Sequence, residues 1–472
     1  MRLALVLLGL PLEAFAHAFG ERYELPVPVW LFIVGGALTV TLTFVIVSLF
    51  ARAGAERYAG MRWNLAPTAI GRLLLQPWVI ALLKASGVAA LVLVVVAGFA
   101  GSKDPNRNIA PTLVWILWWM GFTYLTVLFG NLWPAVNPWR TLFDFASGTG
   151  NRKPFPAWLA GWLALAGLLV FGWVELIFPF RATPAVLASL VVAYSVITWA
   201  GMARYGPDAW LANADPFHRL FELFSRFAPF AVLPREGLVL RPFGAGLLWR
   251  DGRGLSMPET GFVIAMLAIV LFDGFQSSKH WVALEDFVHA IDPKLGDAGW
   301  IALHTAGLVA MWLAFAALYL LACAIAGRLG GGAPSTLECA RAFAPTLIPI
   351  AVGYQFAHTF TYLLVQGQNV VFLASDPLGL GWNLFGTGGF VADIAIIKTK
   401  TAWYLALGAI VTGHAISVFL AHVAAERLHG SRASALRALV PMTVLMVIYT
   451  IISLQILAEP LVRYSGPQET II

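Results

Sequence analysis

Residues 77–100 read PWVIALLKASGVAALVLVVVAGFA, an almost unbroken apolar run. A helix of this length is long enough to cross the roughly 30 Å hydrocarbon core of a bilayer, because each residue adds about 1.5 Å. The stretch therefore predicts a transmembrane helix, and the rest of the chain repeats the pattern.

Nine further apolar runs have a similar length. They lie at 28–50, 110–130, 157–179, 183–204, 258–274, 299–326, 344–372, 402–426 and 438–458. The whole chain is 60 % hydrophobic and 11 % charged, whereas soluble domains carry about 25 % charged residues. We expect an all-α polytopic membrane protein with about ten transmembrane helices, forming a single helical membrane domain over residues 17–472.

The first sixteen residues, MRLALVLLGLPLEAFA, have the features of a cleavable signal peptide. One basic residue, Arg2, precedes an apolar segment, and Ala14 and Ala16 have the A-x-A spacing that signal peptidase recognises. Cleavage after Ala16 would leave His17 at the mature N-terminus. An N-terminal histidine offers a metal both its α-amino nitrogen and a ring nitrogen, an arrangement known as a histidine brace.

The basic residues predict the orientation of the helices, because cytoplasmic loops are enriched in Lys and Arg. With the mature N-terminus outside, 19 basic residues fall in inner segments and 9 in outer segments. The protein is therefore expected to be N-out and C-out, with His17 on the extracytoplasmic face. The net charge of +6 reflects this bias and an affinity for the lipid bilayer, and nothing in it indicates nucleic acid.

Two loops are longer than the others. The inner loop, about 205–257, contains LANADPFHRLFELFSRFAPF (211–230), whose phenylalanines and leucines recur at helical spacing. We expect a helix lying on the membrane surface there, with Arg219 and Arg226 toward lipid phosphates and His218 on the surface. The outer loop spans about 275–298.

Polar residues form a stripe in the predicted span 344–372, within GYQFAHTFTYLLVQGQN (353–369). Its members are Gln355, His358, Tyr362, Gln366 and Asn369, which step by three or four residues and so share one helix face. The stripe predicts either a hydrogen-bonded seam between helices or the wall of a hydrophilic pocket open to the outside. In the pocket interpretation, Asp273, His358 and Tyr362 are the candidate catalytic residues.

Histidines and a carboxylate gather on the predicted outer side. They are His17, Asp273, His280, His304 and His358, which come from separate segments. Imidazole and carboxylate are ligands for divalent transition metals such as zinc or copper, so these residues are the candidate metal ligands. No compact motif such as H-E-x-x-H accompanies them.

Haem b is a less favoured cofactor. His358 and His414 are on separate predicted helices and would be the axial pair, but a second matched pair of histidines is missing. His414 and His422, eight residues apart in GHAISVFLAH (413–422), have no assigned role.

Five stretches together resemble a family of bacterial integral membrane proteins known as fenitrothion hydrolases. They are AHAFGERYELPVPVWLF (16–32), GNLWPAVNPWR (130–140), FDGFQSS (272–278), HTFTYLLVQGQ (358–368) and GHAISVFLAHVAAER (413–427). The resemblance extends over almost the whole chain and implies a membrane-embedded enzyme that cleaves the aryl ester bond of organophosphorus compounds. It assigns no residue roles. It also implies location in the bacterial inner membrane.

Three functions are consistent with these patterns. The first is a metal-dependent hydrolase of lipophilic phosphotriesters with an extracytoplasmic site, since hydroxide, a Lewis acid and an apolar pocket suit that reaction. The second is a copper-binding membrane protein, oxidase-like or a channel, which uses the histidine brace; AHA (16–18) is similar to the mature start of periplasmic copper-resistance proteins. The third is a transporter without catalysis, which the absence of internal repeats disfavours.

Overall fold

The computed structural model describes residues 28–50, 54–146, 152–248, 254–332 and 334–458. Within them the fold is all-α apart from three short strands. Nine helices in this part of the chain are long and apolar enough to cross a membrane, the pattern of a multi-pass membrane protein. The signal segment and His17 lie outside the described residues.

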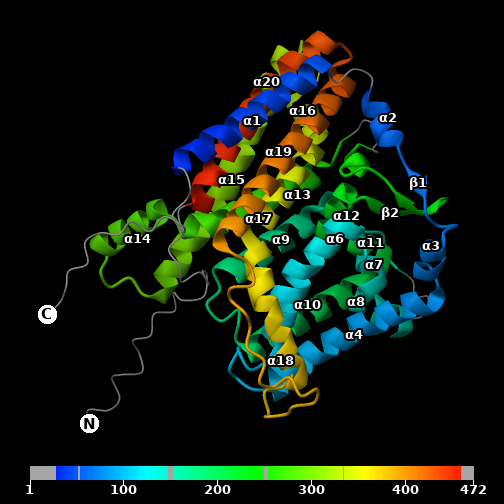
Figure 1. The fold of residues 1–472 in the computed structure, drawn as a ribbon, viewed down its shortest axis with the longest axis vertical. Coiled ribbons are helices and arrows are strands. Elements are labelled where there is room, and N and C mark those ends of the chain that lie inside the picture. The colour runs from blue at the N-terminus through cyan, green and yellow to red at the C-terminus, as the bar shows by residue number, and fades with distance from the viewer. Residues whose placement is uncertain (1–27, 51–53, 147–151, 249–253, 333, 459–472) are drawn as a thin grey trace.

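Eight of these nine apolar helices, together with one less apolar helix, α17, form the bulk of the structure. They are α1 (Val29–Phe50), α4 (Pro77–Ala100), α9 (Trp162–Leu176), α10 (Pro184–Tyr205), α13 (Met257–Gln276), α15 (Asp297–Leu329), α17 (Ile348–Gln366), α19 (Thr399–His429) and α20 (Arg432–Ala458). α1, α15, α19 and α20 pack together, whereas α4 packs against α10 on the other side of the molecule (Figure 1). α13 lies between these groups, contacts α9, α15 and α17, and has most of its residues buried.

Shorter helices connect or cover the long ones. They are α2 (Gly54–Gly60), α3 (Ala69–Leu74), α5 (Ile109–Pro111), α6 (Thr123–Phe129), α7 (Trp133–Val136), α8 (Pro138–Ala146), α11 (Pro207–Asn213), α12 (Pro216–Phe227), α14 (Lys279–Ile291), α16 (Thr336–Phe343) and α18 (Val370–Ser375). α14 fills the predicted outer loop and projects away from the bundle (Figure 1). At GNLWPAVNPWR (130–140) the helix is interrupted, because α6 ends at Phe129 and the chain resumes as α7 and α8.

Two of the predicted spans differ from a plain helix. Thr112–Phe122 is a π-helix, η2, joined to α5 and α6, and no sequence pattern indicated it. The predicted span 344–372 is divided into a 3₁₀ turn, then α17, a second 3₁₀ turn and α18. α17 is not among the nine strongly apolar helices, because its polar stripe lowers its hydropathy.

A small antiparallel sheet was not predicted. β1 (Trp63–Asn64), β2 (Phe230–Leu233) and β3 (Gly237–Leu240) pair in the order β1-β3-β2. β2 and β3 form a hairpin with Phe230 opposite Leu240, and Trp63 pairs with Leu240 from the other side. The sheet therefore ties the segment after α2 to the long loop predicted at 205–257.

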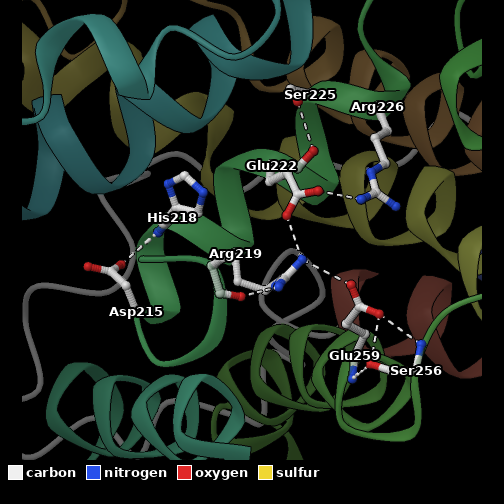
Figure 2. A network of polar contacts seen from close by, with 9 residues as sticks. Asp215, His218, Arg219, Glu222, Ser225, Arg226, Ser256 and Glu259 are labelled. Carbon is white, nitrogen blue, oxygen red and sulfur yellow. Dashed lines mark hydrogen bonds and ion pairs between the residues drawn. The ribbon is translucent and has the colours of Figure 1, made fainter. Parts of the chain in front are cut away.

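α12 is the helix expected in that loop, and its apolar face and its arginines contact protein rather than the lipid expected for them. Protein covers its apolar face, where Phe221 and Leu223 are fully buried. Its arginines bind carboxylates of the same chain (Figure 2). Arg219 pairs with Glu222 and with Glu259 of α13, and Arg226 pairs with Glu222.

The pKa values of two residues on α12 reflect its burial and its ion pairs. Burial raises the pKa of Glu222, but the attraction of Arg226 and Arg219 outweighs it and brings the pKa below its usual value. His218 is half-buried rather than on the surface, and burial lowers the pKa of its imidazole. The helix is thus held in the bundle by internal ion pairs.

α17 and α19 cross with their backbones in contact. A Cβ added to Gly413 would lie 2.5 Å from the carbonyl oxygen of Pro349, and one added to Gly353 would lie 2.6 Å from that of Ala409. Small residues at a crossing let two membrane helices approach closely. This contact brings the face of α17 that carries Gly353 directly against the face of α19 that carries Gly413.

Replacing Gly413 with valine should destabilise the protein by about 1–3 kcal/mol or more, because backbone cannot move away from the added methyl groups. Thermal unfolding in detergent measures the effect. Gly408→Ala on the same helix is the matched control, since nothing lies within 4 Å of an added Cβ there. Equal stability of the two variants would show that α17 and α19 do not cross at Gly413.

Candidate functional site

Asp273 and His358 form a hydrogen-bonded pair between two long helices. Asp273 lies in the last turn of α13 and His358 in the second half of α17, and their Oδ2 and Nε2 atoms are 2.6 Å apart. The Asp273 side chain is 42 % exposed and the His358 side chain 21 %. A carboxylate that accepts from Nε2–H fixes the imidazole ring and leaves Nδ1 as its basic atom.

Aromatic and acidic side chains surround this pair. The Tyr354 ring lies parallel to the His358 ring, with 6.2 Å between their centroids. Glu175, near the end of α9, accepts a hydrogen bond from Trp119 Nε1 of η2 and is close enough to Asp273 for their charges to interact. The site thus holds a second carboxylate.

Tyr362 is one helical turn beyond His358 and is half-buried. Both Asp273 and Arg181 act electrostatically on its hydroxyl. The third predicted catalytic residue is therefore within the electrostatic range of the Asp273–His358 pair.

Hydrogen bonds lie beside and within the polar stripe of α17. Tyr124 of α6 shares a hydrogen bond of 2.8 Å with Thr359, next to the stripe, and donates to the Phe356 carbonyl oxygen at 3.2 Å. Within the stripe, Asn369 Nδ2 donates to Gln366 Oε1 at 2.9 Å. His358 is the stripe residue whose side chain contacts a carboxylate of another helix.

His304 belongs to a second pair. Its Nε2 lies 2.9 Å from Glu285 Oε1 of α14, and its Nδ1 lies 2.8 Å from Gln276 Oε1 of α13. Trp281 Nε1 also donates to Glu285 Oε1 at 2.9 Å. Because Gln276 is three residues after Asp273, the two pairs are neighbours on α13, yet both ring nitrogens of His304 already contact protein oxygens.

The five predicted metal ligands are brought together only in part. Asp273 contacts His358, His304 contacts Glu285 and Gln276, and His280 is exposed on α14. In the ranges that the structure covers, no group of three or more His, Cys, Asp or Glu side chains is arranged to hold a metal ion. His17, the fifth, lies outside those ranges.

His414 of α19 lies in the interior of the protein. His414 is buried, and its Nδ1 lies 2.8 Å from the Ile410 carbonyl oxygen. Its ring is 5.9 Å from that of Tyr449 in α20, which is in turn 6.2 Å from Tyr354. Ring contacts through two tyrosines therefore connect His414 with His358.

Three residues of this site carried no assigned role at the level of sequence: Tyr354, Gln276 and Trp119. Tyr354 was detectable, because it precedes His358 by four residues and so shares its helix face. Gln276 and Trp119 were not, since their partners come from other helices.

Comparison of the chain with family models, curated proteins and solved structures found no match.

Proposed function

We propose that the protein is a multi-pass membrane hydrolase that cleaves lipophilic organophosphorus esters, with His358 as general base and Asp273 as the residue that orients it. The observation that supports this most is the 2.6 Å contact between Nε2 and Oδ2 at a partly exposed position. An imidazole held by a carboxylate is a general base with a fixed basic atom.

The reaction follows from this assignment. His358 Nδ1 takes a proton from water as the water oxygen bonds to phosphorus, and the bond from phosphorus to the aryl oxygen breaks. The aryloxide leaves and takes up the proton from the imidazole, so that a phenol and a phosphodiester form; the phosphodiester acid loses its own proton to solvent. The Tyr362 hydroxyl donates a hydrogen bond to the phosphoryl oxygen, where negative charge develops.

The proposed substrate class rests on chemistry and on resemblance. A neutral aryl phosphotriester dissolves in the bilayer, and the apolar helices around the site suit its approach from lipid. The resemblance to fenitrothion hydrolases implies the same class of substrate. The excess of basic residues in the inner segments supports an N-out, C-out orientation in the bacterial inner membrane, with the site facing the extracytoplasmic side.

The experiment uses the purified full-length protein in detergent and a dialkyl 4-nitrophenyl phosphotriester. We expect nitrophenolate release, followed by absorbance, at a rate proportional to protein. Inactivity of folded protein toward both phosphate and phosphorothioate triesters would refute the proposed function. A parallel sample treated exhaustively with chelator tests the metal, since undiminished activity would exclude a divalent ion from the mechanism.

A zinc or copper ion fits the proposal only with a further ligand. With His358 acting as the base, Asp273 would supply one carboxylate oxygen, and the mature N-terminus at His17 would supply an amino and a ring nitrogen. Bound there, such an ion would polarise the phosphoryl oxygen as a Lewis acid.

We therefore predict that the mature chain begins at His17. Its α-amino group, with a pKa of about 7.7–8.0, loses a proton to a metal at modest cost near neutral pH. Intact-mass measurement checks the start of the chain, and metal analysis compares it with a variant that retains one extra residue before His17. A chain that starts at Met1, or equal metal content in both proteins, would contradict the prediction.

A further inference from the structure

The helix α14 has an apolar side that the described part of the chain leaves uncovered. Leu284, Phe287 and Ile291 are 39 %, 62 % and 69 % exposed. They are spaced by three and four residues, so they form one strip along the helix. Large apolar side chains that gather on one side of an element, rather than stand singly, mark a surface that contacts lipid or protein.

The opposite side of α14 is mainly polar. Lys279, Asp286 and His289 are exposed there, together with Val282. Because each residue turns a helix by about 100°, these side chains point roughly away from the apolar strip. His280 is the polar residue that shares the side of the strip, in the first turn of the helix. α14 is therefore amphipathic although it is not covered by the bundle.

The start of α14 is fixed by Trp281, the one buried residue of this helix. The Trp281 ring packs edge-on against Phe272 of α13 and His304 of α15, with centroid distances of 5.3 and 5.1 Å. Trp281 Nε1 and His304 Nε2 each lie 2.9 Å from Glu285 Oε1. These contacts fix the rotation of α14 about its own axis, so they determine the direction in which the apolar strip faces.

The length of α13 places the start of α14 at a membrane boundary. α13 has 20 residues, which at about 1.5 Å each span about 30 Å, the thickness of the hydrocarbon core. Its last residue, Gln276, then lies at one edge of that core, and α14 begins three residues later at Lys279. From this point α14 projects away from the bundle (Figure 1).

The surface of α15 indicates the same boundary. Trp281 lies against Gly307, where an added Cβ would be 2.4 Å from the indole ring. The first large apolar side chain of α15 that is exposed is Val309, two residues farther along, and Leu313 follows one turn later. The part of α15 suited to contact with lipid thus begins beside the start of α14.

We propose that α14 is an interfacial helix, which lies at the boundary between lipid headgroups and acyl chains with Leu284, Phe287 and Ile291 toward the acyl chains. The polar side of the helix then faces headgroups and water. A helix with one apolar and one polar side binds a bilayer in this way, through the apolar area that it buries. The inference requires that the bundle lies in a bilayer, and it does not depend on ester hydrolysis.

The test uses the full-length protein in vesicles of phosphatidylethanolamine and phosphatidylglycerol, with a spin label on one introduced cysteine at a time. Phe287→Cys and Ile291→Cys place the label on the apolar strip, and Asp286→Cys and His289→Cys place it on the polar side as matched controls. Relaxation of the label by oxygen, which partitions into lipid, is compared with relaxation by a water-soluble nickel chelate. Both native cysteines are buried, and wild-type protein treated with the same label gives the background.

We expect the ratio of oxygen to nickel accessibility to be several-fold higher at Phe287 and Ile291 than at Asp286 and His289. Equal ratios on the two sides, with nickel reaching every label, would overturn the inference, because α14 would then lie in water. Labels on the apolar strip that neither reagent reaches would also overturn it, since protein would then cover the strip. The labels report the position of α14 whether or not the protein hydrolyses esters, so failure of one proposal is distinguishable from failure of the other.

Discussion

Replacing His358 with alanine is expected to slow ester hydrolysis by about 10²–10⁴-fold, the usual contribution of a general base. The effect should fall on kcat, because the imidazole acts on the attacking water rather than on the aryl group. Asp273→Asn should cause a smaller loss, since an amide still contacts the ring but no longer stabilises its charged form. Nitrophenolate release by purified variants measures both effects.

His289→Ala is the matched control for His358→Ala. It removes an exposed imidazole from α14 and should leave the rate within a factor of about two. His218→Ala and His429→Ala, far from the site, should also stay active. Loss of activity in these variants while His358→Ala remains active would place the site elsewhere.

Among the substitutions considered, Glu259→Ala is expected to lower the free energy of unfolding most, by about 3–5 kcal/mol. Its carboxylate pairs with Arg219 at 2.9 Å and also accepts from the Ser256 backbone and hydroxyl in the capping box of α13 (Figure 2). The two side chains are 8 % and 11 % exposed, so removal of the acid weakens the neutralisation of a buried arginine. Equilibrium unfolding in mixed micelles measures the change.

The exposed pair Arg62–Glu236 provides the comparison. Its atoms lie 3.1 Å apart but the two side chains are 45 % and 34 % exposed, so Glu236→Ala should cost less than about 1 kcal/mol. The double variant Arg219→Met with Glu259→Met should recover much of the stability lost in Glu259→Ala, because no unpaired charge remains. A similar loss in both alanine variants would show that α12 is open to solvent.

Hydropathy was sufficient to locate the long helices, because nine predicted spans correspond to apolar helices in the structure. Hydropathy was least informative at α17, because Gln355, His358 and Tyr362 lower the hydropathy of the helix that carries the candidate site. The helical period placed these three residues on one face. That Asp273 is the partner of His358 could not be deduced, since 85 residues separate them and nothing in the local sequence encodes which helices face each other.

Long-range pairing also explains the other differences. The segment with α12 was assigned to the membrane surface because its apolar residues recur at helical spacing beside arginines, and one partner of Arg219, Glu259, lies 40 residues farther along the chain. β1 pairs with a strand that is more than 170 residues away. The π-helix η2 has no distinctive composition, so nothing in the sequence indicated it.

The ion pairs of α12 have a consequence for how the protein is made. Arg219 leaves the ribosome well before Glu259, so α12 reaches the insertion machinery before the carboxylate of α13 is available. The Arg219–Glu259 ion pair can therefore form only after α13 has been synthesised, so α12 reaches its final contacts later than its position in the chain would suggest.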